Sequence, residues 1–245
     1  MLVSKTYKKN VQKIDNEELF GNIFVGSPSL QKVAPAGKFY VAKELRTTLG
    51  VPDYVLLTDG DYKKLQDFAL EYPDIKFSGK YAAVVSFIYK NKQTDIGSLS
   101  KFFSVSKYQA SKSLENLEKW GVVTFQDDER QLVKIRASFV IPQLNSIAIE
   151  LKLSSWEKAL WQAVRNSSQF SSSYIIMPSY KLNLLKSKTE LFVSNKVSTA
   201  VFDIDSLELT HITKAKNSMH FSSRYYIETF SSLISNITSF QEVKS

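Results

Sequence analysis

The segment from Ser146 to Trp156 constrains the fold more than any other part of the chain, because its apolar and polar residues alternate. Apolar residues recur at every second position, as Ile147, Ile149, Leu151 and Leu153. Because strand side chains point alternately to opposite faces, these four share one face, whereas Glu150 and Lys152 share the other. Two charges on a half-buried strand need each other, a metal ion or a polyanionic partner. The pattern predicts a strand followed by a helix; an edge strand with both charges in water is the alternative.

Composition narrows the chemistry that such a strand can serve. The chain has 245 residues, 43% of them hydrophobic, which is enough for one large or two small domains with a proper core. Lysine and arginine number 32 against 24 acidic residues, and the net charge of +8 favours a polyanionic partner, nucleic acid first. The absence of cysteine excludes disulfides and thiol chemistry, and the two histidines, His211 and His220, argue against multi-histidine zinc sites. Any metal is therefore expected to be held by oxygen.

The N-terminus indicates where the protein works. It carries Lys5, Lys8 and Lys9 with no apolar signal core, and no apolar run approaches membrane-spanning length. We therefore expect a soluble, cytoplasmic protein with no membrane partner and no small-molecule cofactor.

Two segments before residue 60 predict a helix that leads into a strand. Helical spacing relates Val41, Leu45 and Thr48. Gly50 is positioned to end that helix, and residues 51–57 form a run rich in β-formers. We expect Glu44 on the helix to approach Asp53 at the start of the strand.

Between residues 79 and 133 the periodicity indicates three helices and a hairpin. The inner faces of the three helices are formed by Tyr81, Val84, Val85 and Ile88, by Ile96, Leu99, Phe102 and Phe103, and by Ala110, Leu114 and Leu117. Ser106 is suited to cap the start of the third helix, and Gly121 to end it in a left-handed conformation. Residues 122–125 and 132–135 then predict the strands of the hairpin. This order is typical of a winged helix-turn-helix.

In a winged helix-turn-helix the third helix enters the major groove of DNA, with its first residues at base edges. The corresponding residues here are Lys107, Tyr108, Gln109, Ser111 and Lys112. Lysine suits phosphates or guanine, and glutamine suits adenine. Three carboxylates at 127–129 argue against insertion of the hairpin tip into DNA, because they repel phosphates. A module that binds protein is the alternative.

A further helix is predicted over residues 155–168. Ser154 and Glu157 have the spacing of a capping box. One apolar face is formed by Trp156, Ala159, Leu160 and Ala163. Another face carries Lys158, Gln162 and Arg165, which either meet solvent or steady a phosphate backbone. Residues 174–178 and 200–204 then predict buried strands.

Together these residues resemble the restriction-endonuclease-like, or PD-(D/E)XK, nucleases. Pro52-Asp53 is similar to the first half-motif of that family, and Glu150-Leu151-Lys152 is similar to the second. Gln162 resembles a supporting helical glutamine of exonuclease-like members, although Asn166 stands where those members have tyrosine. The resemblance implies an α/β (α+β) fold, in which a mixed-sheet core flanked by helices is interrupted by the winged-helix domain.

The resemblance also implies roles for individual residues. Asp53 and Glu150 would bind Mg²⁺ or Mn²⁺, with the backbone carbonyl of Leu151 as a further ligand. Glu44 would be the helical glutamate that many members add, and Lys152 the catalytic lysine. The implied activity is metal-dependent hydrolysis of phosphodiester bonds in DNA, double-stranded DNA above all. Cutting both strands with one site per chain makes a homodimer natural.

The expected organisation has three parts. Residues 1–74 form the N-terminal part of the nuclease-like core, residues 75–137 the inserted winged helix-turn-helix, and residues 138–245 the remainder of the core. Two other functions stay open: a DNA-binding regulator whose nuclease-like core is catalytically silent, and a partner-binding subunit of a nucleoprotein complex.

Overall fold

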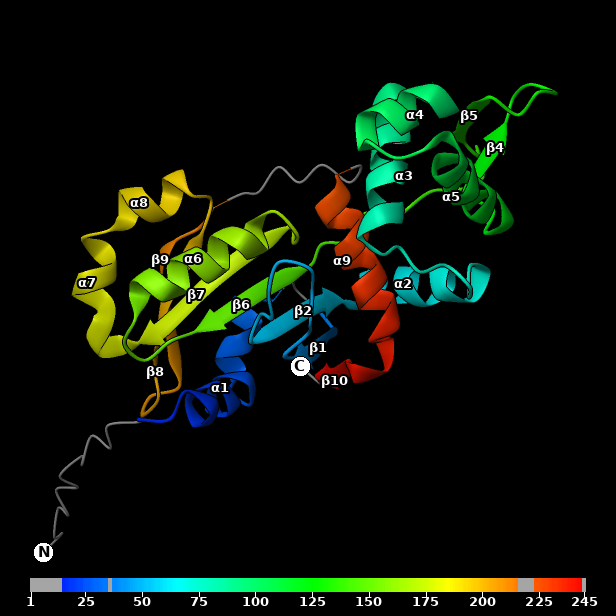
Figure 1. Ribbon diagram of the computed structural model, residues 1–245. Helices are drawn as coiled ribbons and strands as arrows, with labels where there is room; N and C mark the ends of the chain where they lie inside the picture. The colour runs from blue at the N-terminus through cyan, green and yellow to red at the C-terminus, as the bar shows by residue number, and fades with distance from the viewer. Residues whose placement is uncertain (1–14, 35–36, 216–222, 244–245) are drawn as a thin grey trace, which may run out of the picture.

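The computed structural model describes residues 15–34, 37–215 and 223–243, and its centre is a seven-stranded mixed sheet (Figure 1). The helices are α1 (Glu17–Val25), α2 (Asp59–Glu71), α3 (Gly79–Asn91), α4 (Ile96–Phe103), α5 (Lys107–Lys119), α6 (Trp156–Ser167), α7 (Leu182–Lys186), α8 (Thr189–Ser194) and α9 (Arg224–Ser235), with 3-10 turns η1 (Pro28–Lys32), η2 (Ser179–Lys181) and η3 (Ile237–Ser239). The strands are β1 (Phe39–Lys43), β2 (Tyr54–Thr58), β3 (Gln93–Asp95), β4 (Val123–Phe125), β5 (Leu132–Ile135), β6 (Ile147–Leu151), β7 (Ser172–Pro178), β8 (Ser198–Asp203), β9 (Glu208–Thr213) and β10 (Gln241–Val243). Over these described ranges, no helix combines the length and apolarity needed to cross a membrane.

The large sheet has the strand order β10-β1-β2-β6-β7-β8-β9. β6, β7 and β8 run parallel to one another, and every other neighbouring pair is antiparallel. All five residues of β6 are buried, as expected of a central strand covered on both faces. The expected mixed α/β class and the strand around Glu150 are therefore confirmed.

The alternation of side chains along each strand builds a separate core on each face of the sheet. One core, beneath α1 and η1, includes Ile147, Ile149, Leu151 and Leu153 as predicted. On the opposite face, Ala148 of β6 joins a core shared with α2 and α9, while Ile175 of β7 packs with α6, α7 and α8. Glu150, the charged residue of β6, therefore lies beneath a helix and not at an exposed edge.

The helix predicted over residues 41–48 is wrong. Val41 belongs to β1, whose five residues pair with β2 in an antiparallel ladder, so a long-range pairing overrides the local helical spacing. Glu44 follows the strand with a φ of 51°, in the left-handed region, which ends the extended conformation. Gly50 then accepts hydrogen bonds from Thr47 in the turn that leads to β2.

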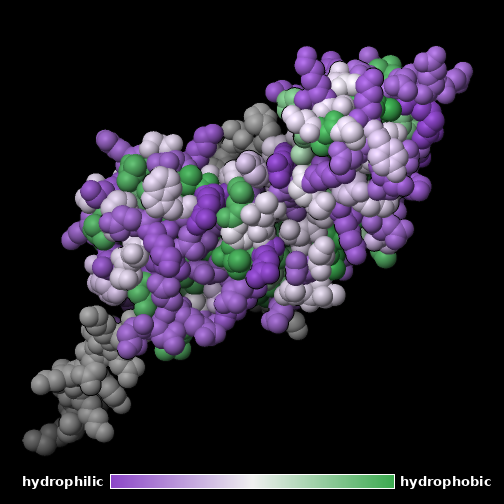
Figure 2. Space-filling view, in the orientation of Figure 1, coloured by the Kyte–Doolittle hydropathy of each residue, from purple (hydrophilic) through white to green (hydrophobic). Residues whose placement is uncertain are grey.

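Helices α3, α4 and α5 form a module with a small sheet of order β3-β5-β4 (Figure 1). Ser106 caps α5 as predicted, in a capping box with Gln109, and Gly121 follows the helix with a φ of 76°. The module is not packed separately from the large sheet, because one apolar core contains both Leu114 of α5 and Val55 of β2. Its visible surface is mostly hydrophilic (Figure 2).

The module leaves the sheet at the end where β2 finishes. α2 begins directly after Thr58, the last residue of β2, and leads into α3. The opposite end of the same two strands is where β2 begins at Tyr54 and the antiparallel β6 finishes at Leu151 (Figure 1). Residues that precede β2 or follow β6 are therefore held at the far end of the sheet from the module.

Candidate active site

Asp53 and the last residues of β6 meet at that far end of the sheet. Antiparallel pairing sets Tyr54 opposite Ile149, so Asp53 stands beside the end of β6. The backbone N–H of Leu151 donates a 2.7 Å hydrogen bond to Oδ2 of Asp53. This bond fixes the carboxylate of Asp53 against the backbone at the end of β6.

Lys152 lies with its ammonium group among oxygen atoms. Its Nζ donates to Oε2 of Glu17 at 3.1 Å and to the backbone carbonyl of Leu151 at 2.9 Å, and it is 3.5 Å from Oδ2 of Asp53. The side chain is only 8% exposed. Burial opposes the charged form, but the negative charges of Asp53 and Glu17 outweigh it and raise the pKa of Lys152. The lysine is therefore a fixed cation.

Glu17 is a site residue that sequence reasoning missed. It is the first residue of α1, and besides binding Lys152 its Oε1 accepts a 3.3 Å hydrogen bond from the backbone N–H of Leu153. A local signal was present, because Asn16 is an N-cap and is followed by two acidic residues in the first turn. That signal predicts the start of a helix, but not its position beside β6.

Glu150 is buried on the face of the sheet covered by α6, with 1% of its surface exposed. Nδ2 of Asn166 donates a 2.7 Å hydrogen bond to Oε1 of Glu150. Its other oxygen, Oε2, is buried and has no hydrogen-bond partner among the described residues. Burial, reinforced by the negative charge of Asp53, raises the pKa of Glu150 to about 7, although Asn166, Lys152 and Arg165 act in the opposite direction.

A cavity of about 190 Å³ opens beside these residues, lined by Glu17, Glu18, Lys43, Glu44, Asp53, Tyr54 and Leu151. Glu44 reaches it because its backbone N–H donates to the carbonyl of Asp53 at 2.9 Å, which extends the β1–β2 ladder. The structure thus brings Glu44 and Asp53 together as expected, but from a turn instead of a helix. The glutamate that a helix contributes to this cavity is Glu17, the first residue of α1.

Asp53 and Glu150 are the two carboxylates that would have to hold a divalent cation here. Within the described ranges, no group of three or more His, Asp or Glu side chains is arranged to hold a metal ion. The expected backbone ligand, the carbonyl of Leu151, accepts a hydrogen bond from Lys152. However, the orphaned oxygen of Glu150 and the repulsion between Glu150 and Asp53 are both relieved by a bound cation. These two carboxylates therefore fit an oxygen-liganded metal.

On α6, Asn166 and not Gln162 contacts Glu150. The Oε1 of Gln162 is buried without a hydrogen-bond partner among the described residues. The predicted capping box at the start of this helix is wrong, because Ser155 is the N-cap and makes no side-chain capping bond.

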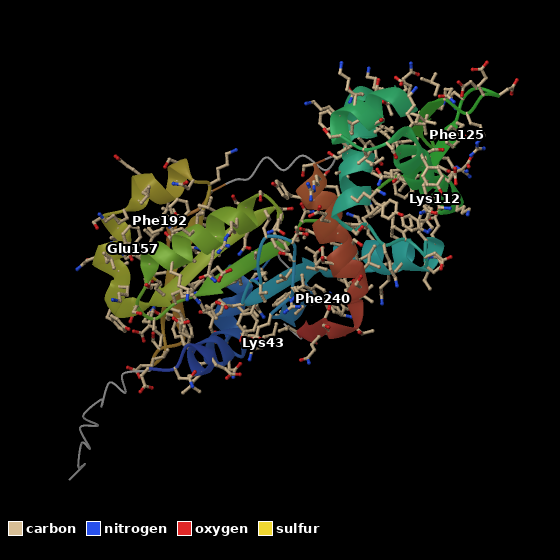
Figure 3. All side chains as sticks on the ribbon, viewed as in Figure 1. Lys43, Lys112, Phe125, Glu157, Phe192 and Phe240 are labelled. Carbon is tan, nitrogen blue, oxygen red and sulfur yellow. The ribbon has the colours of Figure 1, made fainter. Side chains whose placement is uncertain are left out.

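The residues predicted to contact DNA lie on the first turns of α5. Lys107, Tyr108 and Lys112 are exposed. The other two side chains are engaged locally, because Gln109 Oε1 accepts from the backbone N–H of Ser106 at 3.1 Å and Ser111 donates to Glu115 at 3.2 Å. Figure 3 shows Lys112 in the module, far from Lys43 at the cavity. The structure therefore separates these candidates from Asp53, Glu150 and Lys152.

The acidic tip of the β4–β5 hairpin has a structural role. Oδ1 of Asp127 accepts hydrogen bonds from the backbone N–H groups of Gln131 and Leu132, and Arg130 pairs with Glu118 of α5. These contacts close the turn and hold it against the helix.

Comparison of the chain with protein-family models, with curated proteins and with solved structures finds no match. The chemistry of the site therefore carries the assignment of function.

Proposed function

We propose that the protein is a metal-dependent nuclease that hydrolyses phosphodiester bonds in DNA. The observation that carries this proposal is that Lys152 lies 3.5 Å from Asp53 at one end of β2 and β6, two residues after the buried carboxyl of Glu150. Two carboxylates whose charges repel, one of them with an orphaned buried oxygen, stand beside a fixed ammonium. In this combination the carboxylates can bind a cation while the ammonium binds an anionic phosphate.

The arrangement of elements supports a restriction-endonuclease-like core. Outside the residues 75–137 the order is helix α1, the antiparallel strands β1 and β2, helix α2, strand β6 antiparallel to β2, helix α6 and the parallel strand β7. Within that range, three helices and the sheet β3-β5-β4 support an inserted winged helix-turn-helix. The capped, exposed start of α5 is the part of the module suited to DNA.

Asp53 and Glu150 would hold Mg²⁺ or Mn²⁺, and the carbonyl of Leu151, which keeps a second lone pair besides the one that accepts from Lys152, would join them. When bound, such a cation polarises the phosphoryl oxygen and lowers the pKa of an attacking water. The protein's own groups do the rest. Asn166 orients Glu150, Leu151 N–H orients Asp53, and Lys152 places positive charge where the transition state gathers negative charge.

One observation favours a second candidate, a DNA-binding regulator with a silent core. The described residues provide no group of three metal-binding side chains, and the charge of Lys152 is already compensated by Glu17 and Asp53. An internal ion-pair network of this kind needs no bound metal or phosphate to balance the charge of Lys152. In that case the DNA-binding surface would lie on α5, and Glu150 would remain only as a buried acid.

Cleavage of plasmid and linear DNA by the purified protein separates these candidates. With Mg²⁺ or Mn²⁺ we expect cutting that is lost in EDTA and in Lys152→Ala, whose DNA affinity stays near that of the wild type. Lys63→Ala removes an exposed lysine of α2 and serves as the charge-matched control. Firm, salt-dependent DNA binding without metal-dependent cutting would instead support the regulator.

A further inference from the structure

The outer face of α6 carries an exposed aromatic ring between two cations. Lys158, Trp161 and Arg165 are spaced three and four residues apart, so they follow one another along one side of the helix. Trp161 is 70% exposed, although neighbouring positions of α6 bury Leu160 and Ala163 almost completely. A large, flat ring left in water beside a well-packed helix face is available for stacking.

The two cations of this ridge are available as well. Among the described residues, neither Lys158 nor Arg165 takes part in an ion pair. Unpaired, exposed cations one helical turn from an aromatic ring suit the phosphates on either side of a stacked base.

The ridge lies on the helix that covers Glu150. Arg165 precedes Asn166, the buried residue that bonds to Glu150, and its positive charge acts on the Glu150 carboxyl. The ridge and the buried carboxyl therefore lie on the outer and inner sides of the same helix.

A second exposed ring lies where α6 begins. Tyr180 follows β7, which runs parallel to β6 and so ends at the same side of the sheet. Its hydroxyl donates a 3.1 Å hydrogen bond to the carbonyl of Leu153, next to Lys152, yet 59% of the residue is exposed. Nζ of Lys181 lies 5.5 Å from the centre of its ring. This ring is anchored by its polar end and presents its face to solvent.

We propose that this surface, defined by Lys158, Trp161, Arg165, Tyr180 and Lys181, binds single-stranded nucleic acid at the candidate active site. Bases stack on the two rings, and the cations contact the phosphates between them. A duplex fits this surface poorly, because its bases already stack on one another and hide their faces. The substrate of the proposed nuclease is then a single strand or an unpaired segment. This assignment of substrate rests on the proposed function, whereas the proposal of a binding surface does not.

Fluorescence anisotropy in EDTA, with labelled oligothymidylate and a blunt duplex of equal length, tests the surface without cleavage. Trp161→Ala should weaken binding of the single strand about tenfold, since stacking on one aromatic ring contributes about 1–3 kcal/mol per base. Trp161→Phe should restore most of that affinity. Tyr225→Ala removes an exposed ring from α9, which is assigned no contact with nucleic acid, and should leave single-strand affinity unchanged. Equal loss of single-strand and duplex affinity in Trp161→Ala, or no loss, would overturn the inference.

The same proteins distinguish this inference from the proposed function. Single-strand binding that depends on Trp161, in a protein that cuts no DNA with Mg²⁺ or Mn²⁺, would retain the surface and reject the nuclease. Metal-dependent cutting of duplex by Trp161→Ala at the wild-type rate, with unchanged single-strand affinity, would retain the nuclease and reject the surface.

Discussion

Asn166 donates a 2.7 Å hydrogen bond to Oε1 of Glu150, and both residues are buried. The bond joins α6 to the central strand of the sheet at the one acidic residue that β6 carries. Because Oε2 of Glu150 has no partner among the described residues, Asn166 provides the only hydrogen bond that this carboxyl makes within them. Loss of the amide would leave the whole carboxyl without a partner.

Asn166→Leu should therefore destabilise the protein by about 1–3 kcal/mol, the cost of leaving a buried polar group unsatisfied. Urea denaturation at a fixed pH measures this change. The double variant Asn166→Leu with Glu150→Leu removes both partners and should recover most of the loss. If the double variant is destabilised as much as Asn166→Leu alone, or by the sum of the two single variants, the bond does not satisfy Glu150.

The raised pKa of Glu150 predicts that stability falls as pH rises. The pKa is 4.5 for an unperturbed glutamate and about 7 in the folded protein, so between these values the folded state binds more protons than the unfolded state. This contribution is complete below about pH 4.5 and is lost as pH rises through 7, a change of about 3 kcal/mol. The difference in unfolding free energy between wild type and Glu150→Gln, in EDTA, should follow this course. Parallel pH profiles would contradict it.

Asp53→Asn should abolish binding of Mn²⁺ measured by calorimetry, because one of two proposed carboxylate ligands loses its charge. The backbone N–H of Leu151 can still donate to the remaining amide oxygen, so the fold should be preserved. Asp205→Asn, at the exposed turn between β8 and β9, is the control and should bind Mn²⁺ as the wild type does. Unchanged binding in Asp53→Asn would remove this residue from the site.

Replacing both Lys107 and Lys112 with alanine should lower the salt dependence of duplex binding. If each lysine neutralises one phosphate, the slope of log K against log salt falls by about two. A double alanine variant of Lys63 and Lys76, which are exposed lysines outside the module's helices, removes the same charge and should keep the wild-type slope. An unchanged slope in the α5 variant would favour a protein-binding role for the module.

The local patterns predicted the elements around Glu150 well. β6, α6 and β7 each carry a complete signal within their own residues: alternation in β6, helical spacing in α6 and a continuous apolar run in β7. β1 does not, because Val41 and Leu45 have the spacing of a helix. Its conformation is determined by pairing with β2 and β10, which local spacing does not report.

The site was predictable only in the part that two neighbouring residues encode. Glu150 on β6 and Lys152 directly after it are fixed by their neighbouring positions, whereas the contact of Lys152 with Glu17 joins residues 135 positions apart. In the sequence, Asn166 is notable only because it stands where exonuclease-like nucleases have tyrosine. Its amide reaches Glu150 because α6 folds back over β6, and the spacing of the two residues in the sequence does not show this.

The cavity and the start of α5 lie at opposite ends of the central sheet, which sets a length requirement on any nucleic acid that touches both (Figure 1). A short oligonucleotide would reach either the candidate site or the module, and only a longer one would reach both. In the proposed nuclease, the core that connects them would therefore fix how far from the point of anchorage the backbone is cut.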